Sequence, residues 1–429
     1  MEEKKYKQFD FLNIYIKSAL VLGVIGGFFP IVILLVLKSY LHKYSEITYQ
    51  IQIVIEHFFY FGWIGISLMG ITIYFLMKYR DVDVLWKYMP LSTMWLMVSG
   101  VTLKGLFQVF SGNHSFATLV ILGGLLEFSS VIVYSYMIYI LIHSGKKRRE
   151  KYEDFIITGC FWFFLAGCLN LYGIFFMVQN ELLYFPPQYE KIINHILFFG
   201  FFLTTVIGIS LRSIPEILGF KPVKDFLNNE ILWLLTLGIF LMGYSLVREK
   251  GMPFMLSTTM EFFSIMAFIY SLNIFRKMDK ARFSGEDLMF ARFIRISYFW
   301  ATAFIFYYIV LNYYWLITGR DIRFVYAFIR DQLCVEGALT MLIIGIFYRI
   351  MAELNNNIPY KFEGSRQVFW LLNIGVLMKI VITLIYYFHR TTGFMFLIIS
   401  QLMIAVAAGI FLIDVWTTDK RKEKGEVFF

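Results

Sequence analysis

Charged residues are scarce in this chain, and their scarcity limits its class. Only 16% of the 429 residues are Asp, Glu, Lys or Arg, whereas 59% are hydrophobic. A soluble chain of this length needs a larger share of polar side chains to cover its surface. The composition therefore excludes an ordinary soluble protein and indicates an integral membrane protein.

Cysteine is rare as well, and the common nucleotide-binding motifs are missing. The three cysteines, Cys160, Cys168 and Cys334, lie inside apolar segments and form neither a CxxC pair nor a zinc-type spacing. We expect them to pack against neighbouring helices. The sequence contains no P-loop, no GxGxxG and no linker long enough for a soluble domain. These absences leave disulfide frameworks, zinc sites and nucleotide-binding domains without support.

Long apolar segments are abundant instead. They predict an all-α polytopic membrane protein in which residues 1–429 form a single membrane domain with twelve transmembrane helices. The expected spans are roughly 17–39, 49–77, 88–110, 116–142, 155–178, 188–211, 230–248, 255–275, 290–317, 324–349, 367–388 and 393–416.

The loops between these spans differ in positive charge. The segments GKKRREKYED, FRKMDKARF and DKRKEKGEVFF are basic, whereas SGNHS, REKGMP and HRTTG carry less positive charge. Because Lys and Arg stay on the cytoplasmic side, we expect an inner (cytoplasmic) membrane protein with both termini cytoplasmic. The net charge of +9 then reflects topology and contact with the lipid bilayer. No basic patch interleaved with exposed aromatics indicates nucleic-acid binding.

One spacing recurs three times along the chain. A lead residue is followed by glycines five and thirteen positions later, and successive copies are 138 and 137 residues apart. The three sets are His57, Gly62 and Gly70; His195, Gly200 and Gly208; and Gln332, Gly337 and Gly345. In an α-helix these glycines lie about 140° and 220° from the lead residue, so we expect them to pack closely while the lead residue faces the other way.

The next two spans of each copy repeat too. Trp95, Trp233 and Trp370 follow the same intervals, and Glu127, Glu261 and, more weakly, Gln401 lie on the span after that. Two independent spacings with one period predict internal repeats over roughly 11–148, 149–284 and 285–418. The twelve helices would then form three pseudo-symmetric four-helix arcs.

Polar residues at equivalent depths are the candidate functional residues. His57 and His195 are candidate metal ligands, since a neutral imidazole in an apolar bundle ligates haem iron well; the alternative is a hydrogen bond to a neighbouring helix. Met242 and Met252 remain open as substitutes for His195. Gln332 is a poor ligand and is expected to hydrogen-bond nearby.

The acidic and basic residues of this layer allow two interpretations each. Glu127 and Glu261 either relay protons and orient the histidines, or pair as neutral groups across helices. Lys104 and Lys379 either meet anionic groups such as haem propionates, or extend toward the outer interface. His114 and His389, near the outer ends of their spans, are expected to be interfacial.

The segment HxxxFGW from His57 and the later YFL, within twelve spans of three arcs, resemble the catalytic subunit of haem–copper oxidases. HILFFGFFLTTVIGISLRSIP, from His195, is more similar to the NnrS family, a haem-binding branch of that superfamily linked to nitric-oxide stress. The resemblance covers the membrane region in architecture and short parts of spans two, six and ten in motif. Span ten carries Gln332 and no histidine, and span six carries His195 alone, so no copper centre is expected.

The resemblance implies a haem-binding membrane protein in nitric-oxide stress or respiratory redox chemistry, with respiratory or electron-transfer proteins as partners. It assigns no catalytic residue and leaves enzymatic turnover open. Two alternatives stand beside it: a cofactor-free membrane transporter, and an oxidase-like respiratory subunit without a copper centre.

Overall fold

The computed structural model describes residues 9–41, 46–82, 88–182, 187–223, 227–248, 251–277, 288–318, 329, 332–354, 362–388 and 393–424. Every regular element in these ranges is helical. They include twelve helical stretches that are long and apolar enough to cross a membrane. The prediction of an all-α polytopic membrane protein is confirmed.

The observed spans differ from the sequence-based ranges mainly at their ends. They are Phe11–Lys38, Thr48–Arg80, Met89–Phe110, His114–His143, Tyr152–Gln179, Tyr189–Leu218, Asn228–Arg248, Gly251–Leu272, Met289–Thr318, Gln332–Leu354, Ser365–Thr383 and Met395–Thr417. The second span extends through Lys78 to Arg80, beyond the first charged residue. Arg80 is buried and pairs with Glu153, so its charge does not end the helix.

The chain forms two compact units. The first comprises Met1–Phe59, Asp279–Phe304 and Ile322–Phe429, and the second comprises Tyr60–Met278 and Ile305–Asp321. The boundaries fall within the π-helix η2 (Phe58–Gly65) and the helix α13 (Met289–Thr318).

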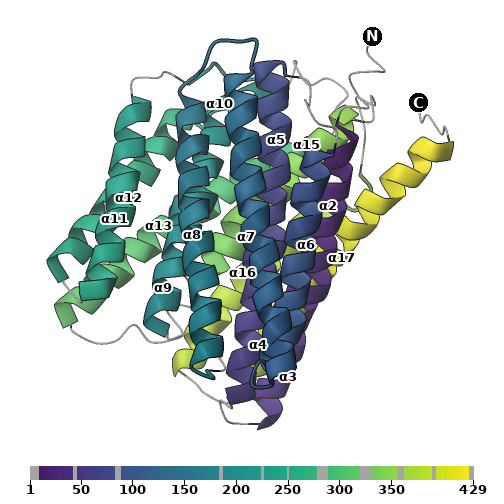
Figure 1. The fold of residues 1–429 in the computed structure, drawn as a ribbon. Helices are drawn as coiled ribbons and strands as arrows, with labels where there is room; N and C mark the ends of the chain where they lie inside the picture. Colours follow the sequence, from purple (N-terminus) through teal and green to yellow (C-terminus); the bar gives the residue numbers. More distant parts are fainter. Residues whose placement is uncertain are drawn as a thin grey trace. The chain divides into compact units, whose positions relative to one another are not determined.

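The first unit contains a helical hairpin of α16 and α17, and α17 packs against α2 and α3 (Figure 1). Its aromatic core includes Phe293 and Phe411 on either side of Tyr348. Its elements are α2 (Asp10–Leu22), η1 (Gly23–Phe28), α3 (Phe29–Leu41), α4 (Glu46–His57), η7 (Gln332–Leu339), α15 (Thr340–Leu354), α16 (Ser365–Phe388) and α17 (Gly393–Lys424).

The second unit contains two further hairpins, α6 with α7 and α11 with α12, and α8 packs on α7 and α10 (Figure 1). The rings of Phe163 and Phe201 stack in its core, 3.8 Å apart between centroids. Its elements are α5 (Ile66–Arg80), α6 (Met89–Phe107), η3 (Gln108–Phe110), α7 (His114–His143), α8 (Tyr152–Gln179), α9 (Pro187–His195), η4 (Ile196–Leu203), α10 (Thr204–Leu218), α11 (Asn228–Arg248) and α12 (Gly251–Leu272).

Local sequence explains several helix ends. Asn113 caps α7, because its side-chain oxygen accepts a hydrogen bond from the backbone N–H of Ser115 at 3.0 Å. Glu153 and Asp154 lie in the first turn of α8, where negative charge is favourable. Helix α10 ends at Gly219, whose φ of 71° suits a residue without a side chain.

Three π-helical segments of eight residues interrupt the apolar helices at related positions. η2 and η4 begin directly after His57 and His195, and η7 begins at Gln332. A π-helix has more residues per turn than an α-helix, so each residue rotates the chain by a smaller angle. The side chains of His195 and Gly200 therefore diverge less than the α-helical expectation of about 140°.

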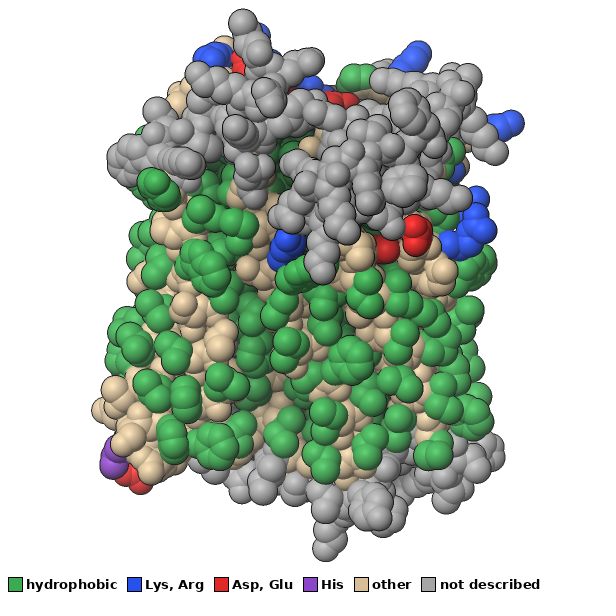
Figure 2. Space-filling view, turned by 90° about the vertical axis from the view of Figure 1, so that its right-hand side faces the viewer, with side chains coloured by type: hydrophobic (Ala, Val, Ile, Leu, Met, Phe, Trp, Pro, Cys, Tyr) green, Lys and Arg blue, Asp and Glu red, His purple; other side chains and the backbone are tan. Residues whose placement is uncertain are grey.

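The surface in Figure 2 is dominated by apolar side chains, with Lys, Arg, Asp and Glu gathered toward the ends of the view. The repeated tryptophans Trp95, Trp233 and Trp370 are 54%, 65% and 55% exposed. Exposed aromatics at helix ends are typical of the interfaces between a membrane and water.

Candidate functional site

The lead residues of the repeated spacing occupy the starts of the π-helical segments. His57 is the last residue of α4 and is buried, His195 is the last residue of α9, and Gln332 is the first residue of η7 and is buried. π-helical turns inside α-helices are frequent at functional sites. These three positions are therefore where we look for chemistry.

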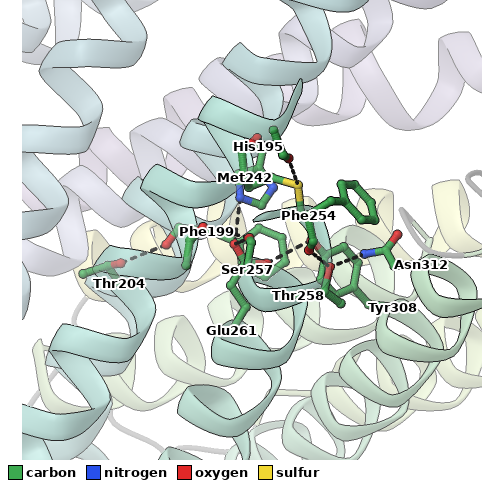
Figure 3. A network of polar contacts seen from close by, with 12 residues as sticks. His195, Phe199, Thr204, Met242, Phe254, Ser257, Thr258, Glu261, Tyr308 and Asn312 are labelled. Carbon is green, nitrogen blue, oxygen red and sulfur yellow. Dashed lines mark hydrogen bonds and ion pairs between the residues drawn. The ribbon is translucent and has the colours of Figure 1, made fainter. Parts of the chain in front are cut away.

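His195 forms a hydrogen bond with a buried carboxylate (Figure 3). Its Nε2 lies 2.9 Å from Oε1 of Glu261, a residue of α12 that is 0% exposed. The hydroxyl of Tyr308, on α13, donates to Oε2 of Glu261 at 2.9 Å, and the hydroxyl of Ser257 donates to Oε1 at 3.3 Å. The carboxylate of Glu261 thus accepts hydrogen bonds from three side chains.

This arrangement sets the tautomer of His195. Because Glu261 acts as the acceptor for its partners, we assign the ring proton of His195 to Nε2, which leaves an unprotonated lone pair on Nδ1. Nδ1 makes no hydrogen bond to a residue that the structure describes. The ring stacks on Phe199 at 4.7 Å between centroids, and this contact holds its plane.

A short series of polar contacts continues along the same two helices. Nδ2 of Asn312 donates to Oγ1 of Thr258 at 3.2 Å, one turn away from the Tyr308–Glu261 bond. The hydroxyls of Thr259 and Tyr313 lie 2.8 Å apart. α12 and α13 are therefore joined by several side-chain hydrogen bonds next to His195 (Figure 3).

Lys104 belongs to a second buried cluster. Its Nζ donates to Oδ1 of Asn170 at 2.8 Å, Nδ2 of Asn170 donates to Oε2 of Glu127 at 3.1 Å, and Nζ lies 3.9 Å from Glu127. Lys104 also lies 5.9 Å from the ring centroid of Phe61. Lys104 and Glu127 are 5% and 2% exposed, so the opposite charges compensate each other inside the helices.

Lys379 belongs to a third buried cluster. Its Nζ donates to both carboxylate oxygens of Glu336, at 2.8 Å and 2.9 Å, and also to Oε1 of Gln401. Lys379 is 1% exposed and Gln401 is 0% exposed. The amine is fully engaged with these two side chains, so it does not extend toward the interface in this structure.

The three clusters involve positions related by the sequence interval. Lys104, Met242 and Lys379 are equivalent, and so are Phe61, Phe199 and Glu336. The partners that sequence reasoning missed obey the same rule, because Asn170 and Tyr308 are 138 residues apart. That shared interval was the signal that could have found them.

Close packing of the repeated glycines also follows the interval. A Cβ on Gly200 would lie 2.7 Å from the side chain of Trp162, and a Cβ on Gly337 would lie 3.0 Å from that of Trp300. Trp162 and Trp300 are themselves 138 residues apart. The close approach expected for these glycines is observed.

The remaining candidate residues are not gathered at His195. His114 is exposed at the start of α7 and Met252 is 70% exposed, whereas Met242 is buried. His389 lies outside the described residues. Beside His57, Oε1 of Glu56 accepts a hydrogen bond from Gln52 at 2.8 Å.

The donor set of His195 fits one axial position of a haem. Ligating histidines commonly donate their second ring N–H to a carboxylate, which fixes the ring and raises its basicity. His195 and Glu261 provide this pair, with Nδ1 as the ligating atom. The described residues contain no group of three or more His, Cys, Asp and Glu arranged to hold a metal ion, and this agrees with a single imidazole rather than a multi-ligand cage.

Comparison with protein-family models and with curated proteins found no match. The function must therefore be argued from the arrangement of side chains and from the sequence motifs.

Proposed function

We propose that this chain is a haem-binding membrane protein of NnrS type that acts in nitrosative stress or respiratory redox chemistry. The observation that supports the proposal best is the hydrogen bond between Nε2 of His195 and the buried carboxylate of Glu261. It presents an unprotonated Nδ1 on an imidazole whose orientation is fixed by Phe199 and Glu261. Haem supplies an iron that binds nitric oxide or transfers electrons.

The other candidate residues have subsidiary parts in this proposal. His57 is the second candidate ligand, because it holds the equivalent lead position before η2. Lys104 and Lys379 are already compensated by Glu127 and Glu336, so contact with haem propionates would require these ion pairs to open. No copper centre is included, since spans six and ten lack the additional histidines.

The proposal includes the arrangement of the chain. The twelve spans form three quasi-equivalent four-helix arcs, with both termini in the cytoplasm and the protein in the inner membrane. Recurrent contacts at the 138-residue interval support it: the Gly200–Trp162 approach is matched by Gly337–Trp300, and Asn170 and Tyr308 approach equivalent glutamates. Respiratory or electron-transfer proteins are the proposed partners.

Absorption spectroscopy tests the haem assignment. The protein, purified from haem-replete cells, is expected to show a Soret band that shifts on reduction. His195→Ala is expected to lose haem or change the band, and Glu261→Gln to shift it. The matched control is His114→Ala, an exposed histidine at a helix start, which should leave the spectrum unchanged. A colourless wild-type protein would reject the proposal.

A cofactor-free transporter is the second candidate. The observation that favours it is the pair of buried Lys–Glu contacts inside membrane-spanning helices, which haem binding alone does not require. Buried ionisable pairs in transporters often lie on substrate or ion pathways. Under this alternative, proteoliposomes of the colourless protein should accumulate a labelled solute or protons, and Lys379→Met should abolish the accumulation.

A further inference from the structure

Two buried glutamines of the first unit have hydrogen-bonding atoms that no described residue satisfies. Both amide atoms of Gln332, Nε2 and Oε1, are without a partner, and so is Nε2 of Gln401. Gln332 is 4% exposed and Gln401 is 0% exposed. An unsatisfied amide inside a membrane protein is strongly unfavourable, so these atoms need a partner.

The two amides adjoin the same buried ion pair. Oε1 of Gln401 accepts a hydrogen bond from Lys379, so its unpaired Nε2 lies beside this lysine. Gln332 precedes Glu336 by four residues in η7, which places the two side chains about one turn apart on one face. Glu336 in turn bonds Lys379.

The equivalent positions in the second unit show what is different here. Gln332 corresponds to His195, and Gln401 corresponds to Glu261. His195 and Glu261 bond each other directly at 2.9 Å, whereas both glutamine amides lack such a bond. A molecule between Gln332 and Gln401 would restore the link that the histidine and the glutamate make without one.

We propose that Gln332 and Gln401 form a binding site for a small neutral molecule that both donates and accepts hydrogen bonds. The amide N–H groups offer donors, and Oε1 of Gln332 offers an acceptor. Lys379 and Glu336 already cancel each other's charge, so an added ion would remain uncompensated at low dielectric. A water molecule and a small organic amide share the required chemistry, and a buried water needs two to four such partners.

This site goes beyond the proposed function, since it requires no haem and lies away from His195 in the chain. Its test is therefore independent of the Soret band: a colourless protein with a bound neutral molecule remains a possible result, and so does the reverse.

The sign of a stability change tests occupancy. The melting temperature of the full chain is measured in lipid nanodiscs for the wild type, for Gln332→Met and for Gln367→Met, an exposed glutamine of the same unit. If a molecule bridges the amides, Gln332→Met removes its partner and lowers the melting temperature by about 2–4 °C or more. If the amide is truly unsatisfied, the same substitution removes an unfavourable group, and the melting temperature rises. An unchanged or raised value overturns the proposal.

A titration with acetamide identifies the occupant. A saturable rise in the melting temperature of the wild type that is absent in Gln332→Met assigns an organic amide. Destabilisation by Gln332→Met without a saturable effect of acetamide assigns water. If Gln332→Met does not fold, an experimental structure of the wild type in nanodiscs replaces it: density within hydrogen-bonding distance of both amides supports the site, and a direct bond between the two amides overturns it.

Discussion

Lys379 and Glu336 form a buried ion pair in which one ammonium nitrogen lies 2.8 Å and 2.9 Å from the two carboxylate oxygens. The equivalent positions in the second unit are Met242 and Phe199, so the chain itself contains an apolar solution for the same place. Ionic and apolar pairs are thus alternative fillings of one pair of positions.

A double-substitution cycle at this pair follows. Lys379→Met alone leaves the carboxylate of Glu336 buried and uncompensated, and we expect it to lower the free energy of unfolding by about 3–5 kcal/mol. Lys379→Met with Glu336→Phe should recover most of this loss. The measurement is thermal unfolding in nanodiscs; two substitutions whose effects simply add would contradict the coupling.

The bond from Tyr308 to Glu261 can be tested on its own helix. Tyr308→Phe removes a hydrogen bond to a buried carboxylate, and we expect a loss of about 1.5–3 kcal/mol. The control is Tyr313→Phe, whose hydroxyl contacts the neutral hydroxyl of Thr259 at 2.8 Å and is expected to contribute about 0.5–1.5 kcal/mol. Equal effects of the two substitutions would argue against an ionised Glu261.

The repeated glycines give a steric prediction. In Gly200→Ala the new methyl group would lie 2.7 Å from the side chain of Trp162, so we expect a loss of about 1–3 kcal/mol from overpacking. Gly243→Ala is the matched control, because no atom lies within 4 Å of its added Cβ. The control should be neutral or stabilising by up to about 1 kcal/mol through helix propensity.

Arg80 fastens the loop between α7 and α8. Its guanidinium donates to the backbone carbonyls of Ile142 and Lys147 and lies 3.6 Å from the buried carboxylate of Glu153. Arg80→Met should release the basic loop and leave Glu153 unpaired. We expect trypsin to cleave between residues 146 and 151 at least several-fold faster than in the wild type, while Arg149→Met, an exposed partner of Asp154, leaves the rate of the remaining cleavages near normal.

The cytoplasmic termini can be checked by labelling. In a cysteine-free background, Ser115→Cys at the start of α7 and Lys147→Cys after its end place thiols at opposite ends of one span; both positions are exposed. A membrane-impermeant maleimide should label position 115 in intact spheroplasts and position 147 only after permeabilisation. The reverse pattern would invert the topology.

The sequence was sufficient for the class of fold and for the number of spans, because apolar length alone decides both. It predicted span ends less well. Hydropathy stops a span at charged residues, yet Arg80 continues its helix by bonding carbonyls of a distant loop. Such contacts depend on tertiary structure that no local window contains.

The candidate residues were found in the sequence, but most of their partners were not. Glu127 and Glu261 occupy the same repeat position, yet Glu127 contacts Asn170 and Lys104 whereas Glu261 contacts His195. The period identifies equivalent positions, and side-chain chemistry then decides which neighbour each one binds. The π-helical segments were also missed, since an α-helical period was assumed throughout.

The π-helical segment η4 gives the spacing of this region a mechanical meaning. Its wider turns hold a given length of chain between His195 and the rest of its span. Removing one residue there would let the segment tighten into an ordinary α-helix and turn everything before it, His195 included, by about 100° relative to α10. The imidazole would then leave Glu261 although no residue of the site had been replaced. Length itself, counted in single residues, is thus an inherited property of this helix that substitution data alone would never reveal.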